Sequence, residues 1–261
     1  MSRAAPRALA VFAHPDDETF GIGGTLARAV EAGWKVTAVS ATRGEVGEIA
    51  DPALATPETL GEQRESELRA ACDELGVADV RFLGYRDSGM AGTPENADPR
   101  AYANADSEEV TGRLVEIMRE VEPDAVFTFD ERGGYGHPDH IAIHRHAAAA
   151  FGRAARPGAR LWFSAIPRGV LRQWAEEMRR NNIEGLMTSL DPEVGVADEE
   201  ITAAVDVTPW IDAKRRAIAA HATQVPDWMR ALPAERRAAM FAREYFILGA
   251  GDAAKDPLAL A

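Results

Sequence analysis

The chain has 261 residues, of which 46% are hydrophobic and 27% are charged, a balance that is typical of a globular protein and excludes a mainly disordered one. Its formal net charge of −13 argues against nucleic-acid partners, because binding to a phosphate backbone requires clustered Lys and Arg. The single cysteine excludes a disulfide framework and no apolar run approaches the roughly 20 residues of a membrane span, so we expect a cytoplasmic protein without membrane partners.

The first part of the chain alternates short apolar runs with amphipathic segments. The apolar runs predict buried strands at 8–13, 35–41, 79–83, 125–129 and 161–166. The amphipathic segments predict helices at 19–32, 57–75, 107–121 and 138–151, with Ser107 as the N-cap of the third. This alternation predicts an α/β fold, namely a Rossmann-like, open, mostly parallel sheet with helices on both faces.

The alternation weakens after residue 166. The pattern there predicts a helix at 169–180, a strand at 201–207, a helix at 209–223 and a final apolar segment at 245–248. We therefore expect one domain, 1–261, with an α/β core at 1–166 and a C-terminal extension at 167–261 that walls the site. The segment 86–106 is rich in Gly, Pro, Asn and Asp, and its length is compatible either with a substrate-facing loop or with a surface excursion.

Two polar motifs follow predicted strands. The first is Ala13–Glu18 (AHPDDE), directly after the first strand, and the second is Gly134–His140 (GYGHPDH), shortly after the fourth. Ligands of open α/β sheets bind beyond the carboxyl ends of the strands, where the strand order reverses. In the common order 3-2-1-4 the first and fourth strands are neighbours at that point, so we expect the two motifs to face each other across one crevice.

Imidazoles and carboxylates gathered in this way suit a divalent metal. A catalytic zinc takes three protein ligands and keeps one position for water, and His14, Asp17 and His140 can form that set. Asp16 would remain free to accept a proton from the bound water, while His137, as an imidazolium, could stabilise an oxyanion and protonate a leaving amine. The alternative is that the acids merely favour a helix start and that the prolines are ordinary turn residues.

Competing motifs are weak. The glycines at 21–24 lack the dinucleotide-binding spacing, and the chain contains neither a Gly-x-Ser-x-Gly elbow nor a P-loop lysine. His144 and His146 continue the predicted helix and are interpreted as flank residues rather than as ligands. Cys72 lies on the apolar face of its helix, where a packed thiol is expected.

The paired motifs resemble those of the LmbE-like, or PIG-L, superfamily of zinc-dependent N-deacetylases, over residues 8–165. This resemblance implies His14, Asp17 and His140 as ligands of Zn²⁺, with Fe²⁺ or Co²⁺ also acceptable to such a site. It also implies that Asp16 is the general base and that His137 stabilises the oxyanion. Asp139 is implied as the partner that orients His137, and Tyr135 as a residue near the substrate carbonyl.

Within the superfamily, the run Asp87–Pro94 and the Gly133–Gly136 loop most resemble those of mycothiol-pathway members. That similarity implies a metal-dependent hydrolase that removes acetyl from an N-acetylglucosamine-type conjugate, with a conjugate amidase or a non-catalytic sugar-binding homologue as alternatives. It implies sugar contacts from four residues, Glu45, Arg64, Asp87 and Ser88, and places His221 near the site, although His221 can equally be an ordinary helix end. The partner is a small amino-sugar conjugate, and a homo-oligomer remains open.

The group joined to the sugar is expected to be small and polar. No basic amphipathic helix is available to dock on a membrane, and the segment 86–106 carries Asn and Asp side chains that suit hydroxyl-rich ligands. The opposing hypothesis is an apolar pocket walled by the C-terminal extension, with four candidates that can also be core residues: Trp174, Met178, Trp210 and Trp228.

Overall fold

The fold is built on one mixed sheet. The computed structural model describes residues 4–180, 183, 186–189, 191 and 193–260. Within these residues, seven strands have the order β3-β2-β1-β4-β5-β7-β6. Their bounds are β1 Arg7–Phe12, β2 Lys35–Thr42, β3 Asp79–Tyr85, β4 Ala125–Phe129, β5 Arg160–Ser164, β6 Ala203–Asp206 and β7 Arg243–Ala250. β1 to β5 pair in parallel, and β7 is antiparallel to both of its neighbours, β5 and β6.

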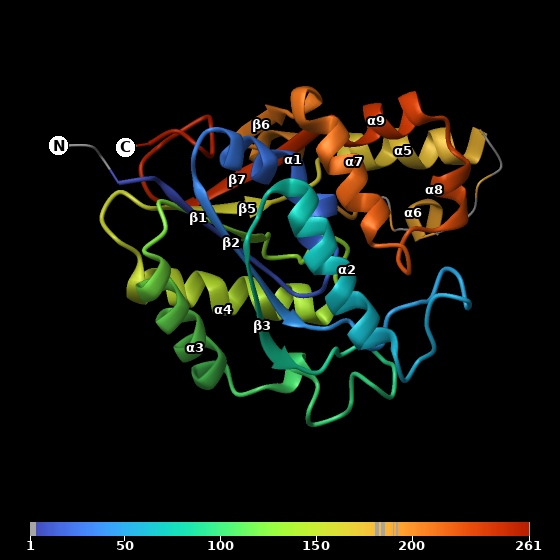
Figure 1. Ribbon diagram of the computed structural model, residues 1–261, viewed down its shortest axis with the longest axis horizontal. Coiled ribbons are helices and arrows are strands. Elements are labelled where there is room, and N and C mark those ends of the chain that lie inside the picture. Colours follow the sequence, from blue (N-terminus) through green and yellow to red (C-terminus); the bar gives the residue numbers. More distant parts are fainter. Residues whose placement is uncertain (1–3, 181–182, 184–185, 190, 192, 261) are drawn as a thin grey trace.

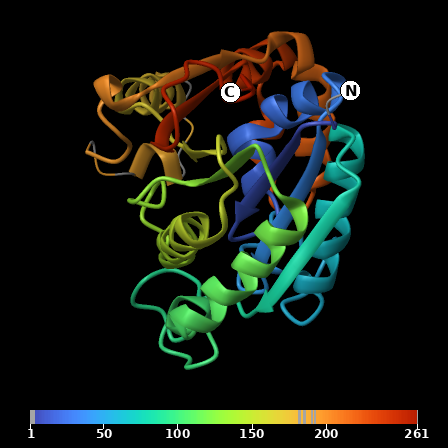
Figure 2. The same cartoon turned by 90° about the vertical axis from the view of Figure 1, so that its left-hand side faces the viewer.

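Helices cover both faces of this sheet. Their bounds are α1 Asp17–Glu31, α2 Leu60–Leu75, α3 Ser107–Val121, α4 Pro138–Ala154, α5 Arg168–Arg180, α6 Leu186–Ser189, α7 Ile211–Ala220, α8 Asp227–Ala231 and α9 Ala234–Phe241. Successive side chains of a strand point to opposite faces. Ala8, Ala10 and Phe12 of β1 therefore pack in one core with α1, α2 and α7, whereas Leu9 and Val11 pack in a second core with α3 and α4 (Figures 1 and 2). The predicted α/β fold class and the 3-2-1-4 strand order are confirmed.

The start of α3 differs from the prediction. Asp106, rather than Ser107, is the N-cap: it has an extended backbone, and its side chain accepts a hydrogen bond of 2.9 Å from the N–H of Glu109. Ser107 is already the first helical residue, so its side chain is one position too late to cap the exposed N–H groups.

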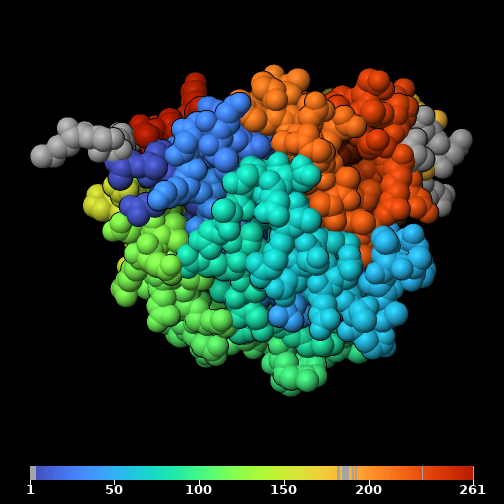
Figure 3. Space-filling model, viewed as in Figure 1, coloured from blue at the N-terminus to red at the C-terminus, as the bar shows by residue number. Residues whose placement is uncertain are grey.

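The C-terminal extension completes the sheet and covers one end of it. β7 and β6 add to the edge beside β5, and α7 packs against α1 and α2. α5, α8 and α9 group together beyond α7, and the orange and red residues of the extension cover the upper right of the face seen in the space-filling view (Figures 1 and 3). The predicted span 1–261 includes residues 1–3, 181–182, 184–185, 190, 192 and 261, which lie outside the described part of the chain.

A buried ion pair joins the extension to α1. Lys214 Nζ lies 2.6 Å from Glu244 Oε1, and both side chains are 1% exposed. α1 is kinked at Ile22, where φ is −138°, and the Glu244 carboxylate accepts hydrogen bonds of 2.8 Å from the N–H groups of Gly24 and Thr25 just beyond the kink. Glu244 thus caps the second half of α1 from a strand that is distant in sequence. A search of the described residues finds no helix long and apolar enough to cross a membrane.

Candidate metal centre and active site

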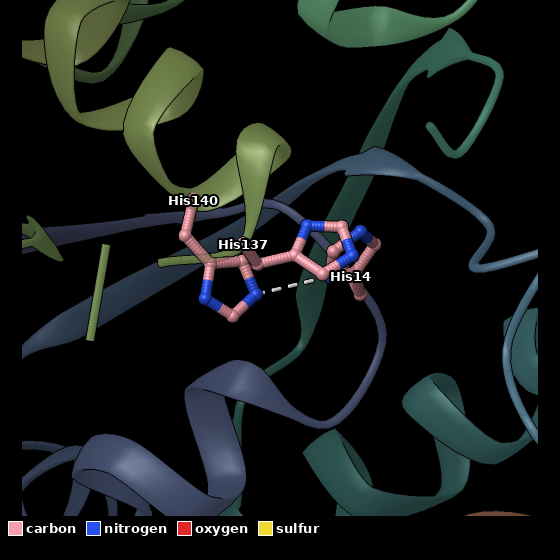
Figure 4. A group of neighbouring side chains, drawn as sticks. All are labelled: His14, His137 and His140. Carbon is pink, nitrogen blue, oxygen red and sulfur yellow. Dashed lines mark hydrogen bonds between the residues drawn. The ribbon is translucent and has the colours of Figure 1, made fainter. Parts of the chain in front are cut away.

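The two polar motifs meet where β1 and β4 lie side by side. β1 ends at Phe12 and α1 begins at Asp17, so the residues between them form the loop at the carboxyl end of β1. His137 and His140 lie at the start of α4, after β4, which pairs in parallel with β1. Figure 4 shows the rings of His14, His137 and His140 gathered between these segments. The crevice predicted from topology is therefore present.

The hydrogen bonds of His14 define which of its nitrogens can bind a ligand. His14 Nε2 lies 3.1 Å from Asp139 Oδ2 and 3.4 Å from Asp87 Oδ1. A carboxylate only accepts hydrogen bonds, so Nε2 carries the hydrogen. Nδ1 is then the nitrogen that directs a lone pair toward the centre of the site when the ring is neutral.

His140 is oriented in the opposite sense. Its Nδ1 lies 3.2 Å from the carbonyl oxygen of Gly133, which also can only accept, so the lone pair of His140 lies on Nε2. That atom is 3.2 Å from His14 Nδ1, the contact drawn as a dashed line in Figure 4. Asp17 completes the group, with Oδ1 3.4 Å from His140 Nε2 and Oδ2 3.6 Å from His14 Nδ1. The two ring nitrogens therefore face each other, and the Asp17 carboxylate lies beside both rings, with a different oxygen toward each.

This donor set fits a divalent cation. Ligand atoms at the corners of a tetrahedron with bonds of about 2.0–2.2 Å are separated by about 3.3–3.6 Å, close to the spacing found here. Burial lowers the pKa of His14, but Asp87 and the hydrogen bonds to Asp139 and Asp17 hold that pKa well above its ordinary value. Burial raises the pKa of Asp17, but His140 and His14 hold it well below its ordinary range. Both shifts show that the site attracts positive charge.

His137 lies beside the three donors and is the N-cap of α4. Its Nδ1 accepts a hydrogen bond of 3.2 Å from the N–H of Asp139, so Nε2 is the nitrogen left to donate. One nitrogen from each of His14, His137 and His140 lies within 4.8 Å of the others, which makes His137 an alternative third ligand. Burial and His14 lower the pKa of His137. The predicted imidazolium is therefore not its resting form, although a neutral ring still donates through Nε2.

Asp139 has a different partner from the one expected. Its carboxylate accepts hydrogen bonds from His14 Nε2, from the N–H of Ser88 at 3.0 Å and from the Ser88 hydroxyl, whereas it reaches His137 only through its backbone N–H. The prediction that this carboxylate orients His137 is wrong, because the first turn of α4 directs it across the crevice to the loop after β1. Asp139 holds the ring of His14 instead, as carboxylates commonly do for ligating histidines.

Asp16 is held in an unusual backbone conformation. Its φ of 115° lies in the left-handed region that non-glycine residues rarely adopt, and such strain clusters at functional sites. Arg64 Nη2 lies 3.1 Å from Asp16 Oδ2 and donates to the carbonyl of Pro15 at 2.6 Å. Burial raises the pKa of Asp16 to about 6, although Arg64 opposes the change. Arg64 is only 4% exposed, so it contacts the predicted base rather than open space for a sugar.

The guanidinium of Arg64 requires a glycine beside it. Arg64 Nη1 donates to the carbonyl of Gly44 at 3.0 Å. Gly44 has a φ of +65°, and a Cβ at this position would lie 2.2 Å from Arg64 Nη1. The glycine at position 44 is thus explained by close packing around Arg64.

The other predicted sugar contacts are mostly buried within the protein. Asp87 is 3% exposed, and its carboxylate accepts hydrogen bonds from the N–H groups of Gly89 at 2.9 Å and Val46 at 3.2 Å. Ser88 is fully buried against Asp139, and the half-buried Glu45 accepts from the N–H of Asp87 at 3.1 Å. These side chains surround the donor set and leave little polar surface for a ligand.

His221 lies behind the site. It follows the last residue of α7, is fully buried, and has Nε2 3.2 Å from Glu18 Oε1. Hydrogen bonding to Glu18 outweighs burial and raises the pKa of His221. His221 thus lies near the site, next to the first polar motif, and its full burial points to a contact with Glu18; a direct contact with substrate stays a prediction. It is also the helix end of the alternative interpretation, because it is the C-cap of α7.

The segment 86–106 combines both roles proposed for it. Its first residues, Asp87 and Ser88, bond to the site, and Arg86 forms a β-bridge with Ala101 that closes the rest of the segment into an excursion. Met90 in that excursion is 45% exposed. His144 and His146 are flank residues as interpreted: His144 Nδ1 contacts the carbonyl of Phe129 and His146 Nδ1 contacts the hydroxyl of Tyr102, each at 2.9 Å.

A cavity of about 640 Å³ opens beside the donor set. Asp17, His140 and Tyr135 line one end of it, and the Tyr135 ring centroid is 5.2 Å from that of His140. Other walls come from α1 and from the C-terminal extension, which was expected to wall the site, although most of the residues that line the cavity were not predicted. The signal that could have found them is the apolar stripe Leu171, Trp174, Ala175 and Met178 on α5, whose i, i+3, i+4, i+7 spacing marks one helix face.

A family profile and several known sequences are similar to this chain. The profile of the PIG-L family, described as GlcNAc-PI de-N-acetylase, matches residues 9–151. A protein of Geodermatophilus obscurus is 45% identical over 243 residues, covering 84% of this chain and 83% of that protein. A protein of Salinispora arenicola is 41% identical over 268 residues, covering 96% and 86%. Both are named 1D-myo-inositol 2-acetamido-2-deoxy-alpha-D-glucopyranoside deacetylase.

Solved structures share the fold. N,N'-diacetylchitobiose deacetylase from Pyrococcus horikoshii superposes with a TM-score of 0.62 at 25% identity, covering 94% of this chain and 84% of that one. A 4-carboxy-2-hydroxymuconate hydratase from Pseudomonas putida has a TM-score of 0.63 at 20% identity, covering 98% and 100%. The second likeness shows the fold alone. Because a hydratase and a deacetylase share this fold, the reaction must be argued from the site.

Proposed function

The chain belongs to the PIG-L family of de-N-acetylases, and from this premise we propose that it hydrolyses the acetamide of an N-acetylglucosamine unit in a small conjugate such as N-acetylglucosaminyl-inositol. The products are acetate and the free amine of the glucosaminyl conjugate. The observation that carries the proposal is the convergence of the lone pairs of His14 Nδ1 and His140 Nε2 at 3.2 Å, beside the Asp17 carboxylate. The raised pKa of His14 means that a proton on its Nδ1 bridges the two nitrogens when no metal is bound, and a cation that displaces this proton would receive both lone pairs.

We assign His14, Asp17 and His140 as the residues that hold the metal, with Zn²⁺ as the preferred ion and Fe²⁺ or Co²⁺ as substitutes. When bound, such a metal supplies a Lewis acid and lowers the pKa of water toward about 7. Asp139 and the carbonyl of Gly133 hold the two rings in the tautomers that ligation requires.

Asp16 is the group that we assign as general base. It adjoins Asp17 but is held by Arg64, and burial raises the pKa of its carboxyl to about 6, which suits proton transfer near neutral pH. In hydrolysis, the oxygen of water bonds to the amide carbon while Asp16 accepts a water proton. The carbon–nitrogen bond then breaks, and the amine nitrogen receives a proton. Arg64 acts as a positioning residue that keeps Asp16 out of the ligand set.

His137 and Tyr135 complete the assignment on the substrate side. His137 has Nε2–H free to donate, because its Nδ1 accepts the backbone N–H of Asp139. This donor can stabilise the oxygen of the carbonyl as negative charge develops on it. Tyr135 lines the cavity and is 37% exposed, so its hydroxyl is available to a ligand there.

The direct test is product formation. Zinc-loaded protein is incubated with N-acetylglucosaminyl-inositol, and free amine and acetate are both quantified. The proposal predicts equimolar amine and acetate from wild-type protein. Binding of the conjugate without release of either product would instead support the sugar-binding alternative.

A further inference from the structure

The cavity beside the donor set is far larger than the acetyl group needs. Its volume of about 640 Å³ lies within the range of about 300–1,000 Å³ that is typical of pockets for drug-sized ligands. Asp17 and His140 reach it at one end, so a molecule inside the cavity would be continuous with an amide at the donor set. We call this space, beyond the donor set, the apolar chamber.

Aromatic and aliphatic side chains form the walls of the chamber. Phe20 lies one turn after Asp17 on α1, so the same helix face presents a donor and an apolar wall. The ring centroid of Phe241 is 5.8 Å from that of Phe20 and 6.5 Å from that of Trp174, which makes a row of three rings. Leu171 on α5 and Trp228 on α8 are half-buried and add further walls.

Beyond the donor set, the buried charged groups that reach the chamber are paired, whereas Arg243 and two acidic residues that line it are exposed. Lys214 and Glu244 bond to each other at 2.6 Å, and Glu244 also accepts from two backbone N–H groups of α1. Glu48 and Asp227 are exposed. The two buried charges are thus occupied by each other and by α1, and apolar surface that stays open inside a protein gains free energy when an apolar ligand covers it.

The chamber also bears on the two hypotheses about the group joined to the sugar, a small polar group or an apolar one. Trp174 and Trp228 line it, as the apolar-pocket hypothesis requires. Met178 is buried, and Trp210 lies outside the chamber with its indole N–H donating to Glu31 at 2.7 Å. Two of the four candidate residues therefore support a pocket that a purely polar conjugate would leave empty.

We propose that the apolar chamber binds an alkyl or aryl group of the substrate while the scissile amide lies at His14, Asp17 and His140. This inference rests on the proposed function and extends it to substrates larger and more apolar than an inositol conjugate. The apolar group can be attached on the glycosidic side or form the N-acyl chain, and the two attachments are separable by experiment.

The experiment compares two series of substrates with zinc-loaded protein. One series is alkyl N-acetylglucosaminides from methyl to octyl, and the other is glucosaminyl-inositol carrying N-acetyl, N-butanoyl or N-octanoyl. Each buried methylene is worth up to about a fourfold gain. We expect kcat/KM to rise by about tenfold or more along one series, which identifies the attachment. Flat or falling values in both series would overturn the proposal.

Two variants localise the effect. Leu171→Asp places a charge on the chamber wall, and Trp228→Ala removes an indole from it; each should reduce the ratio of octyl to methyl kcat/KM by about tenfold. Trp210→Phe, outside the chamber, is the matched control and should keep the wild-type ratio. If Leu171→Asp does not fold, Trp228→Ala still tests the point, because Trp228 is only half-buried. An unchanged ratio in a folded chamber variant would contradict the assignment.

A binding measurement separates this inference from the proposed function. Octyl N-acetylglucosaminide is titrated into metal-free protein while tryptophan emission is followed, since Trp174 and Trp228 line the chamber. We expect saturable binding of the octyl compound and at least tenfold weaker binding of the methyl compound. Saturable binding without amine release from any substrate would refute the proposed function and keep the chamber assignment. Amine release without a preference for the octyl compound would support the proposed function and refute the chamber assignment.

Discussion

The two sides of the site are built in opposite ways. On the polar side, the imidazoles and carboxylates that follow β1 and β4 are bonded to one another, so that even Asp87 and Ser88 are held by other protein groups. On the apolar side, the chamber walls supplied by α5, α8 and α9 enclose about 640 Å³ and leave it open. The difference indicates that the polar side is preorganised for chemistry and that the apolar side is shaped for the substrate.

This division follows the course of the chain. The polar side belongs to the parallel core, where the carboxyl ends of neighbouring strands bring loops together. The apolar side belongs mainly to the extension after β5, which is tied to the core through Lys214, Glu244 and the kink of α1.

The largest effect is expected on the polar side, from Asp16→Asn. General-base assistance is worth about 10²–10⁴ in rate, so kcat should fall on that scale while the metal content stays at the wild-type level. Asp252→Asn, an exposed carboxylate near the C-terminus, is the matched control and should keep full activity. If Asp16→Asn loses its metal together with its activity, Asp16 is a ligand and the roles of Asp16 and Asp17 must be exchanged.

The link between the two sides is tested by Lys214→Met. Removal of one partner of a buried ion pair costs about 3–5 kcal/mol because the other charge is left unpaired, and Glu244 is 1% exposed. The free energy of unfolding, measured by urea denaturation, should fall on that scale. Lys255→Met, an exposed lysine, is the control and should have almost no effect.

A double variant sharpens the interpretation. Glu244→Gln removes the uncompensated charge but keeps one oxygen that can accept from α1, so Lys214→Met with Glu244→Gln should recover part of the lost stability. A double variant as unstable as the sum of the single ones would show that the pair acts through separate contacts.

A smaller effect is expected far from both sides, from Asp106→Ala. Loss of an N-cap costs about 1 kcal/mol, so the midpoint of urea unfolding should fall slightly while the metal content and the preference for octyl substrates are unchanged. Glu116→Ala, an exposed position on the same helix, is the control. A change in substrate preference in Asp106→Ala would show that the polar core and the chamber are coupled through α3.

The smallest effect concerns Cys72, which is fully buried on α2. Burial raises the pKa of this thiol, so it stays protonated and the reactive thiolate is absent. We expect almost no alkylation by iodoacetamide in the native protein and complete alkylation in urea. Rapid labelling of the native protein would mean that the core between α2 and the sheet opens readily.

The parts that could be predicted from sequence are those whose signal is local. The continuous apolar run of β1 and the motif that follows it are adjacent in the chain, and the strand order then placed His14 opposite His140. The N-cap of α3 was missed by one residue because Asp106 and Ser107 are both good caps and only the backbone conformation distinguishes them.

The partners of side chains were harder to predict because they depend on tertiary geometry. No local pattern shows that Asp139 contacts His14 rather than His137, that Arg64 bonds to Asp16, or that His221 lies behind Glu18. The chamber was left as one of two alternatives, since an apolar stripe on a helix predicts burial without showing whether the space it faces is filled.

The central claim is that three residues hold one metal, and metal content tests it most directly. One equivalent of Zn²⁺ per chain is predicted, by mass spectrometry after removal of excess ion, for wild type, Asp16→Asn and His137→Ala, and almost none for His14→Ala or His140→Ala. His137 is the decisive control, because its ring lies as close to the cluster as a ligand would. Loss of metal in His137→Ala with retention in an Asp17→Asn variant would contradict the assignment and make His14, His137 and His140 the ligand set.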